Sequence, residues 1–435
     1  MVGTMAKIDD SVKKKVPELR FAGFADDWEQ RKFDECFNFP VSTNSLSRAL
    51  LNYDEGDIQS VHYGDILIKY PAILNVKNDK IPYITDSSFE KYKSNLLENG
   101  DLIFADAAED ETVGKAVEVN GLTEENLVAG LHTIVARSKD KKAEFFLGYY
   151  INSNTYHRQL LRLIQGSKVS SISKGNLQKT LVSFPKDFEE QQKIGAFFKQ
   201  LDETIALHQR KLDLLKEQKK GYLQKMFPKN GEKVPELRFA GFADDWEERK
   251  LSDVANHRGG TAIEKYFDKD GVYKVISIGS YGLNSQYVDQ NIRAISNEIT
   301  DGRVVNSGEL TMVLNDKTAN GTIIGRTLLV EKDNEYVINQ RTEIISPKEN
   351  FDSNFAYTIL NGPFREKVKR IVQGGTQIYV NYPAVSNLNL ELPKIEEQQK
   401  IGSFFKQLDD TIALHQRKLD LLKEQKKGFL QKMFV

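Results

Sequence analysis

The chain has 435 residues, a formal net charge of −1 and a single cysteine, Cys36. This length is too great for one ordinary hydrophobic core and favours two or three domains. With 40% hydrophobic and 28% charged residues, the composition is that of a folded protein and excludes wholesale disorder. One cysteine cannot form an internal disulfide, and no apolar run reaches the length of a membrane span, so we expect a cytoplasmic protein.

The chain is internally duplicated. The segment KVPELRFAGFADDWE occurs twice without a change, and a longer segment recurs with 36 of 39 positions identical. The copies are Lys15–Glu29 and Lys233–Glu247 for the first segment, and Glu189–Phe227 and Glu396–Phe434 for the second. The stretches between the copies look almost unrelated. A constant framework with two divergent inserts favours two equivalent docking surfaces for one partner and two different readers of something else.

The domain boundaries follow from this plan. We expect a conserved N-terminal segment, a first globular domain, a long helix with a linker, a second copy of the short segment, a second globular domain and a second long helix. These six segments are 1–32, 33–186, 187–232, 233–250, 251–394 and 395–435.

Both globular regions have the pattern of a mixed α/β domain. Helices are expected near Glu144–Leu163 and Phe355–Val372, and pairs such as Tyr149 and Tyr357, which align at a constant offset, indicate that the two domains share a fold. Short apolar runs bounded by Gly, Asn and Asp predict strands. Examples are Asp65–Lys69, Leu102–Phe104, His132–Ala136 and Val275–Ile278.

Basic residues gather late in each domain. Phe145–Lys186 contains no acidic residue, and the corresponding region Ser353–Leu390 contains one, Glu366. Such a strip is either a solvated surface or a phosphate-facing one, and its recurrence in both halves favours phosphate. The basic residues are Arg158, Arg162, Lys168, Lys174, Lys179 and Lys186 in the first strip, and Arg365, Lys367, Lys369 and Arg370 in the second.

A polar loop that contains glycine follows the expected helix in each domain. Small residues let backbone N–H groups approach an anion, and hydroxyl and amide side chains suit phosphate or base contacts. A glycine turn that ends a helix explains the glycines equally well. The candidate DNA-binding residues are Arg158, Arg162, Gln165, Gly166, Ser167, Lys168, Ser170 and Lys174 in the first domain, and Arg370, Gln373, Gly374, Gly375, Thr376 and Gln377 in the second.

The longer repeat predicts a long amphipathic helix in each half. Its apolar residues recur at heptad spacing over about five heptads. At about 1.5 Å per residue the helix is roughly 57 Å long, and it cannot bury its apolar stripe alone. The expected seam residues, which also mark the candidate docking surface, are Phe198, Leu201, Ile205, His208, Leu212, Leu215, Tyr222, Phe405, Leu408, Ile412, His415, Leu419, Leu422 and Phe429.

We expect the two helices to pair as an intramolecular antiparallel coiled coil with a pseudo-twofold axis, because a globular domain has to begin and end near opposite ends of the pair. Lys219 and Lys426 interrupt the seam, as do the two seam histidines, and such interruptions commonly set register. We interpret the histidines as seam residues, since no second ligand lies at metal spacing beside them. Trp28 and Trp246 are expected to pack against the helices or a docked partner.

Two unlike domains that alternate with two near-identical helices, each opened by P-K-x-(x)-E-E-Q-Q-K-I-G, resemble the specificity (S) subunit of type I restriction-modification systems. The opening lies at Pro185–Ile194 and Pro393–Ile401. The G-D-I-L run at Gly64 and the G-D-L-I run at Gly100 are also similar to the family, and the copy at Gly308 is a looser match. The resemblance covers essentially the whole chain.

The resemblance implies that each variable domain is a target recognition domain for one half of a split DNA sequence. It also implies that the paired helices set the spacing between the halves and dock two modification (M) subunits, on which restriction (R) subunits assemble. The chain itself would have no catalytic role, and S-adenosylmethionine, ATP and Mg would be needed only by partner subunits. The residues agree, because two unlike domains imply an asymmetric site and two like domains would imply a palindrome.

Two other functions were weighed. An intrinsic enzyme is disfavoured because the chain has no N-P-P-Y or D-P-P-Y methyltransferase motif and no G-x-x-x-x-G-K-[ST] loop. Asp106, Asp110 and Lys115 could be drawn into a nuclease site, but such spacing arises by chance in charged proteins. A duplicated coiled-coil scaffold that binds only protein explains the helices and leaves the basic strips unexplained.

Overall fold

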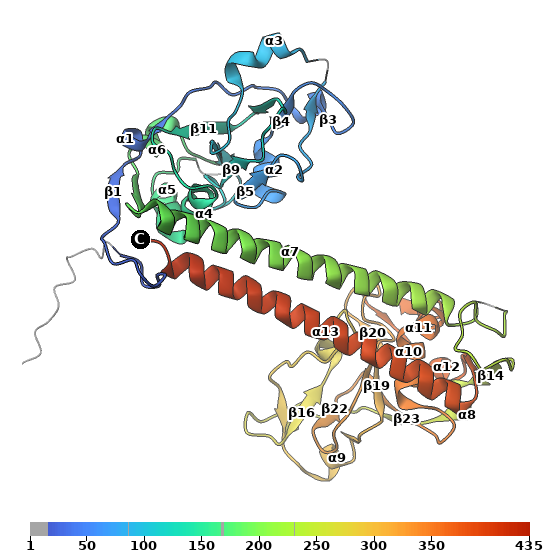
Figure 1. Cartoon of the computed structure of the whole chain (residues 1–435). Coiled ribbons are helices and arrows are strands. Elements are labelled where there is room, and N and C mark those ends of the chain that lie inside the picture. Colours follow the sequence, from blue (N-terminus) through green and yellow to red (C-terminus); the bar gives the residue numbers. More distant parts are fainter. Residues whose placement is uncertain (1–15, 86, 167–168, 230) are drawn as a thin grey trace, which may run out of the picture. The chain divides into compact units, whose positions relative to one another are not determined.

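The computed structural model describes residues 16–85, 87–166, 169–229 and 231–435. It divides into two compact units (Figure 1): unit 1 comprises the chain up to Gln209 together with Lys418–Val435, and unit 2 comprises Arg210–Arg417. The long helices are α7 (Phe188–Lys225) and α13 (Ile395–Lys432). Each unit therefore contains one globular domain and a stretch of both long helices.

The globular part of unit 1, domain 1, is built from short elements. Its helices are α1 (Phe33–Cys36), α2 (Tyr63–Ile68), α3 (Phe89–Tyr92), α4 (Phe146–Ile151), α5 (Asn154–Leu161) and α6 (Lys174–Gln178), with 3-10 turns at Arg48–Leu50 and Lys93–Asn95. Its strands are β1 (Glu29–Lys32), β2 (Phe37–Asn38), β3 (Leu51–Asn52), β4 (Gln59–Val61), β5 (Ile73–Asn75), β6 (Tyr83–Ile84), β7 (Leu102–Ala105), β8 (Ala107–Ala108), β9 (Ala116–Asn120), β10 (Leu127–Ala129), β11 (Thr133–Ser138), β12 (Ser170–Ser171) and β13 (Leu181–Phe184).

The globular part of unit 2, domain 2, has a similar series. Its helices are α8 (Leu251–Val254), α9 (Glu298–Asp301), α10 (Ser353–Asn361), α11 (Pro363–Lys369) and α12 (Tyr382–Ser386), with 3-10 turns at Glu264–Tyr266 and Ile278–Ser280. Its strands are β14 (Glu247–Lys250), β15 (Ala255–Gly259), β16 (Tyr273–Ile276), β17 (Arg293–Ala294), β18 (Val304–Val305), β19 (Leu310–Val313), β20 (Asn315–Asp316), β21 (Thr327–Leu329), β22 (Tyr336–Ile338), β23 (Thr342–Pro347), β24 (Gln373–Gly374), β25 (Ile378–Tyr379) and β26 (Asn389–Leu392).

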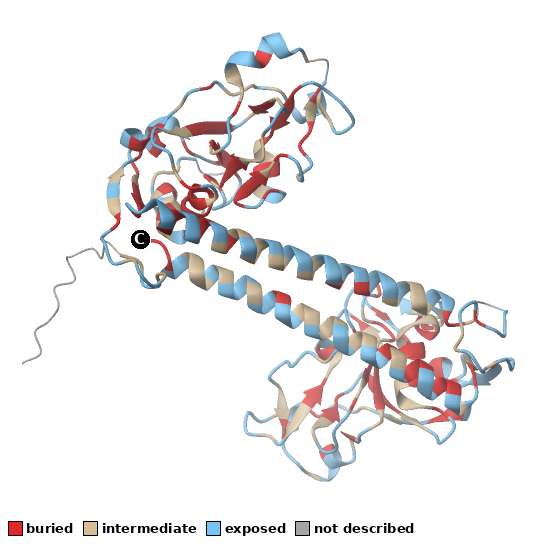
Figure 2. Cartoon of the chain, in the orientation of Figure 1, coloured by how far each residue is buried: buried red, intermediate tan, exposed pale blue. Residues whose placement is uncertain are grey.

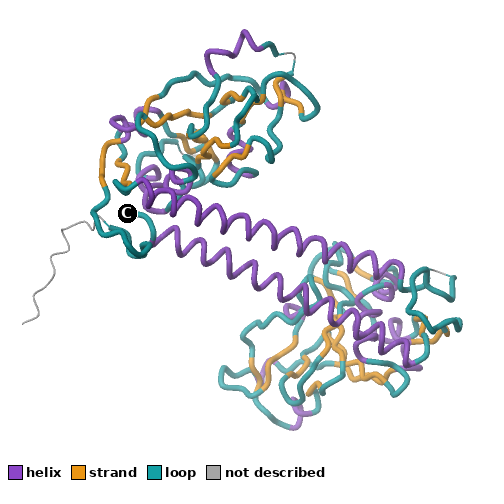
Figure 3. Tube along the Cα trace, viewed as in Figure 1, coloured by secondary structure: helices purple, strands orange, loops and turns teal. Residues whose placement is uncertain are grey.

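The two domains share a core topology, to which domain 1 adds β5 beside β9 and domain 2 adds β18 beside β22. In domain 1 the larger sheet has the order β2-β11-β7-β9-β5, and in domain 2 the corresponding order is β15-β23-β19-β21. Each domain has a second sheet with one parallel pair, β4 with β10 or β16 with β22. Figure 3 shows these strands inside each domain and the long helices outside the sheets. The prediction of one mixed α/β fold present twice is confirmed.

One predicted strand is wrong, because most of Asp65–Lys69 belongs to helix α2. The ring nitrogen Nδ1 of His62 accepts a hydrogen bond from the backbone N–H of Gly64 at 3.2 Å and caps the helix. The buried Asp65 accepts from Arg48 Nη1 at 2.6 Å. A short apolar run fits a strand or a buried helix equally well. Here the His62 cap and the Arg48–Asp65 contact stabilise the helix.

The other sequence-based elements are close to those observed. The remaining predicted strands appear as β7, β11 and β16, the last shifted by two residues towards the N-terminus. Each expected helical region is divided in two, α4 with α5 and α10 with α11. In domain 2 the division occurs at Gly362–Pro363, where proline suits the first turn of the new helix.

The core of each unit includes residues from both long helices (Figure 2). The core of unit 1 contains Phe198 of α7 and Phe434, which follows α13. The core of unit 2 contains Phe405 of α13 and Phe227, which follows α7. The two helices are therefore part of each globular core and not only a connection.

The long helices run antiparallel within each unit (Figure 1). In unit 1 the ring of Phe197, near the start of α7, lies 5.1 Å from that of Phe429, near the end of α13. In unit 2 Tyr222, near the end of α7, lies 5.0 Å from Phe404, near the start of α13. The predicted antiparallel coiled coil is confirmed.

Candidate nucleic-acid interface

The short repeated segment fastens each domain to its helix through one buried ion pair. In unit 1 Arg20 donates from Nε and Nη2 to the Glu190 carboxylate at 2.6 and 2.8 Å. In unit 2 Arg238 binds Glu397 in the same way at 2.7 Å for both contacts. Both carboxylates are buried, and the hydrogen bonds raise the pKa of both arginines. The repeated sequence thus makes a repeated structural contact.

The glutamines of the helix-opening motif also bind within their own unit. Gln191 Nε2 donates to the carbonyl of Pro185 at 2.9 Å, and Gln398 Nε2 donates to that of Pro393 at 2.9 Å. The motif therefore fixes the start of each helix on its domain. It serves the framework and presents no chemistry of its own.

The glycine of the same motif allows helix and domain to approach closely. A Cβ at Gly195 would lie 2.5 Å from the carbonyl oxygen of Glu144, and one at Gly402 would lie 2.6 Å from the backbone nitrogen of Phe355. Any larger residue would separate the helix from the domain.

Both tryptophans are buried against the helices. Trp28 packs edge-on against Phe434 at 6.3 Å, and Trp246 packs edge-on against Phe227 at 5.9 Å. The prediction that they pack against the helical framework is confirmed.

The predicted seam residues of both helices are buried or half-buried. The lysines that interrupt the seam bind aspartates of the facing helix, Lys426 with Asp202 and Lys219 with Asp409. The structure buries Phe198, Leu212, Leu215, Phe405 and Leu419, and half-buries Leu201, Ile205, His208, Tyr222, Leu408, Ile412, His415, Leu422 and Phe429.

The polar loop of each domain is a β-hairpin that pairs with the strand after β7 or β19. In domain 1, Gln165 and Ser171 exchange backbone hydrogen bonds at 3.0 and 2.8 Å, and β12 pairs with β8. In domain 2, β24 and β25 form the hairpin, and β25 pairs with β20. We call the described residues 165–166 and 169–171, and Gln373–Tyr379, the polar hairpins.

The glycines of the polar hairpins have a structural cause. Gly166 and Gly374 adopt φ values of 107° and 102°. A Cβ would lie 2.0 Å from the Val169 carbonyl oxygen at Gly166 and 2.2 Å from that of Gln377 at Gly374. Glycine is required by the turn itself, so these two residues give no separate evidence of ligand contact.

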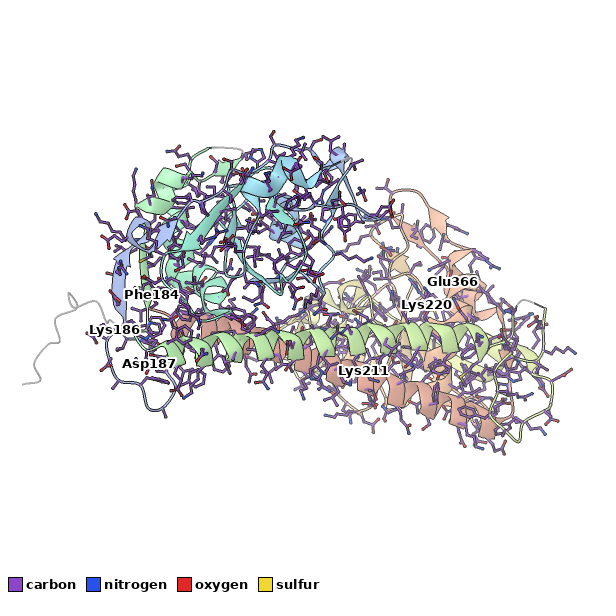
Figure 4. The ribbon with its side chains drawn as sticks, turned by 45° about the horizontal axis from the view of Figure 1, so that its top comes forward. Phe184, Lys186, Asp187, Lys211, Lys220 and Glu366 are labelled. Carbon is purple, nitrogen blue, oxygen red and sulfur yellow. The ribbon has the colours of Figure 1, made fainter. Side chains whose placement is uncertain are left out.

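The candidate DNA-binding residues are accessible. Figure 4 marks Phe184, Lys186 and Asp187, through which the chain passes from the end of the first strip into α7. Ser167 and Lys168 lie outside the described residues. The exposed candidates are Arg158, Arg162, Gln165, Gly166, Lys174, Arg370, Gln373, Gly374, Gly375, Thr376 and Gln377, and Ser170 is half-buried.

In the second basic strip three of the four basic side chains are engaged within the domain, and Arg370 is exposed. Arg365 is buried and donates to the carbonyls of Ile324 and Gly321 at 2.9 and 3.0 Å, and burial lowers its pKa to about 10. Lys367 binds Glu391, and Lys369 binds Glu366. In domain 1, by contrast, Arg158, Arg162, Lys174, Lys179 and Lys186 form no ion pair with another described residue. Among the described residues, domain 1 therefore has five unpaired basic side chains in its strip and domain 2 has one, Arg370.

Sequence reasoning missed one residue in each domain. His132 and Arg341 directly precede β11 and β23 and adopt left-handed backbone angles, with φ of 53° and 66°. His132 Nδ1 lies 3.2 Å from Asp106 Oδ1. Asn315, oriented so that its amide nitrogen donates to Leu314, accepts from Arg341 Nη1 at 2.7 Å. The sequence carries no signal for either residue, because both are defined by backbone conformation.

A half-open cavity of about 1050 Å³ lies in unit 2, against both long helices. Lys220 of α7 and Glu366 of α11, which Figure 4 labels, both line it. The walls also include Leu223, Leu283 and Ile412. The lining residues of the cavity come mostly from the long helices and from the part of domain 2 that faces them, and none of them belongs to the polar hairpin.

Metal-binding clusters and membrane-spanning helices are both absent from the described residues. Within them, no group of three or more His, Cys, Asp or Glu side chains is arranged to hold a metal ion. No helix in that part of the chain is long and apolar enough to cross a membrane.

Comparison with known proteins gives one consistent family. The family model described as the type I restriction modification DNA specificity domain matches residues 25–217 and 243–424. The chain is 24% identical over 277 residues to the type I restriction enzyme MjaVIII specificity subunit of Methanocaldococcus jannaschii. That match covers 61% of this chain and 64% of the relative, which is less than two thirds of the relative's length.

Solved structures share the fold. The S subunit of a type I restriction-modification system from M. genitalium matches with a TM-score of 0.62 and 12% identity, over 97% of this chain and 99% of that one. A chain from a structural study of complex assembly and conformational transition of the type I R-M system matches with a TM-score of 0.51 and 16% identity, over 93% and 96%.

Proposed function

Because the chain belongs to the type I restriction-modification DNA specificity family, we propose that each of its domains reads one half of an asymmetric, bipartite DNA sequence. The observation that supports this most directly is a contrast inside the molecule. The two domains share a core topology and the same contacts to the helices, yet the sequences of their polar hairpins, 165–171 and 373–379, differ at five of seven positions, with only Gln165/Gln373 and Gly166/Gly374 in common. Two domains that recognise different half-sites need the same scaffold but different exposed side chains, because the exposed side chains select the sequence.

The paired helices are proposed to set the spacing between the half-sites. Their register is fixed by partly exposed Lys–Asp ion pairs and by aromatic contacts in both units, and double-stranded DNA rises about 3.4 Å per base pair. A fixed helix length would then correspond to a fixed number of intervening base pairs.

Two methyltransferase (M) subunits are proposed to dock on the exposed leucines of the helices. Each helix exposes two leucines one heptad apart, at 52–60% of their surface. The contact between Lys426 and Asp202 sets a register that brings Leu207 level with Leu421, and the corresponding contact in unit 2 brings Leu214 level with Leu414. The two units thus present one apolar pair each, made of the same repeated positions, which suits two copies of one partner.

The methyltransferase would supply S-adenosylmethionine chemistry, and restriction (R) subunits would join this core with ATP and Mg. The role of this chain would be to bind and orient DNA for its partners.

Co-purification with the cognate methyltransferase, followed by native mass spectrometry and mapping of adenine methylation, tests the proposal. We expect two M subunits per chain and one split, non-palindromic motif. The double variants Leu207→Glu/Leu421→Glu and Leu214→Glu/Leu414→Glu should each reduce the stoichiometry to one, and the combined variant should abolish binding. A wild-type stoichiometry of one, or a palindromic motif, would contradict the proposal.

A further inference from the structure

We propose that His132 and Arg341 are equivalent base-reading residues, one in each target recognition domain. The inference rests on the proposed function and names the side chains through which each domain would select sequence.

The two residues occupy the same place in the fold. Each is the last residue of the connection that leads from the parallel strand pair into the inner strand, from β10 to β11 or from β22 to β23. The next residue, Thr133 or Thr342, closes both connections, because its hydroxyl donates to the carbonyl three residues earlier at 2.6 or 2.5 Å. The sequences Gly-Leu-His and Asn-Gln-Arg thus form one turn.

The backbone conformation at this place favours glycine. A left-handed φ brings Cβ close to the backbone and is uncommon for residues other than glycine; Asn, Asp and His adopt it more often than the rest, and Arg rarely does. Both domains nevertheless carry a long polar side chain there. Residues that keep a side chain in a sparsely populated backbone conformation cluster at functional sites, so we infer that this side chain has a function.

One polar partner holds each side chain and leaves its donors available. Asp106 engages the His132 ring at Nδ1, and Asn315 engages Arg341 at Nη1. Both residues are exposed, and no other described residue forms a hydrogen bond with the second imidazole nitrogen or with the remaining guanidinium N–H groups. The side chains are therefore oriented while part of their hydrogen-bonding capacity faces solvent.

The polar hairpin lies directly beside each of these residues. The backbone N–H of Ile172, which follows the first hairpin, donates to the carbonyl of Asp106 at 2.9 Å. The backbone N–H of Val380, which follows the second, donates to the carbonyl of Leu314 at 2.9 Å, next to Asn315. The turn residue, its partner and the hairpin form one edge of each domain.

The chemistry of the side chains defines what they would read. An arginine with free N–H groups pairs best with O6 and N7 of guanine in the major groove, and an imidazole N–H can donate to a purine N7 or to another base acceptor. Arg341 is therefore assigned to a guanine in the half-site of domain 2, and His132 to a base acceptor in the half-site of domain 1.

Glycine substitutions test the inference, because they remove the side chain and suit the backbone. In the complex with the methyltransferase, His132→Gly and Arg341→Gly should each reduce discrimination at one base pair about 5- to 150-fold, in one half-site only. The unfolding midpoint should stay unchanged or rise by about 1–3 °C. Asn334→Gly, at an exposed left-handed position (φ 59°) away from the hairpins, should give the same stability response with wild-type discrimination.

The readout is the binding ratio for the mapped site against every single-base variant, together with the methylated motif. His132→Asn and Arg341→Asn, which also tolerate the left-handed region, should lose discrimination in the same way. Folded variants that keep wild-type ratios at every position would overturn the inference while the bipartite motif still stood. A wild-type complex with no bipartite motif would overturn the proposed function and the inference together.

Discussion

Lys219 of α7 donates to Asp409 of α13 at 2.5 Å, and the same contact recurs in unit 1 between Lys426 and Asp202 at 2.5 Å. Each lysine is the copy of the other in the repeated helix, and so is each aspartate. The same lysine and the same aspartate of the repeated helix can form both ion pairs only if the two copies of the helix run antiparallel in one register. The polar residues in the seam therefore specify the alignment of the helices.

This ion pair should show measurable coupling. The two side chains are about one quarter exposed, at 28% and 26%, so the energy should be modest. A double-mutant cycle with Lys219→Ala and Asp409→Ala should give a coupling of about 0.5–1 kcal/mol in urea unfolding. The exchange Lys219→Asp/Asp409→Lys should recover part of it. A coupling of zero would show that this pair has no share in helix alignment.

The buried pair of Arg20 and Glu190 should matter far more. Glu190→Gln leaves Arg20 with a neutral partner in a buried site, and the expected loss is about 3 kcal/mol. Hydrogen exchange should place the loss in unit 1, and Glu397→Gln should place an equal loss in unit 2. Glu189→Gln is the matched control, because Glu189 is 66% exposed and binds only Lys193, so its effect should stay below about 0.5 kcal/mol.

Aromatic residues at the ends of the helices should stabilise their own unit. Phe434 is 4% exposed and packs against Trp28, Phe146, Tyr150 and Phe198. Phe434→Ala should cost about 3–5 kcal/mol and increase hydrogen exchange in unit 1. Phe227→Ala should do the same in unit 2. Leu421→Ala, on the exposed surface of α13, should leave both units unchanged, and a global loss of protection from either phenylalanine variant would argue against separate cores.

Unit 1 should lose stability as the pH rises through neutrality. Glu118 is buried and accepts the N–H groups of Phe145 and Gly148 at 2.6 and 2.7 Å, and burial raises its pKa from 4.5 to about 7. A raised pKa means that the folded state holds the proton more tightly than the unfolded state. The contribution is thus complete below about pH 4.5 and is lost as the pH rises through about 7, up to roughly 3 kcal/mol.

Glu118→Gln should remove that pH dependence, since the amide does not titrate. Domain 2 has Leu329 at the corresponding position of the strand ladder, because Glu118 pairs with Leu102 and Leu329 pairs with Leu310. Unit 2 contains Glu343, whose pKa burial also raises, so the expected result in calorimetry between about pH 5 and 8 is that Glu118→Gln changes the pH dependence of unit 1 and leaves that of unit 2 as in the wild type. A variant whose unit 1 midpoint follows the wild type across this range would refute the assignment to Glu118.

The framework could be predicted from the sequence because it is repeated. Comparison of two copies identified the helices, and the heptad pattern placed Phe198 and Leu212 on the buried face. The heptad pattern also marked Lys219 as an interruption. Their partners follow from the antiparallel arrangement, so local sequence and tertiary structure agree here.

The candidate nucleic-acid interface was only partly predictable. Arg365 appeared to belong to a basic surface, but its charge is buried against backbone carbonyls that lie about forty residues earlier in the chain. Asp65–Lys69 is mostly helical, and its contacts with distant residues are those of Arg48 with the Asp65 carboxylate and of Lys115 with the carbonyl of Leu67. His132 and Arg341 are recognisable only by their backbone angles. These features depend on contacts between distant residues, which periodicity and composition do not report.

The exchange of one domain tests the central claim most directly. Residues Gln30–Pro185 would be replaced by the corresponding domain of another family member, and adenine methylation would be mapped in DNA exposed to the chimera and its methyltransferase. The account predicts that one half of the split motif changes, while the other half and the spacing stay as in the wild type. A change in both halves, or in neither, would contradict it.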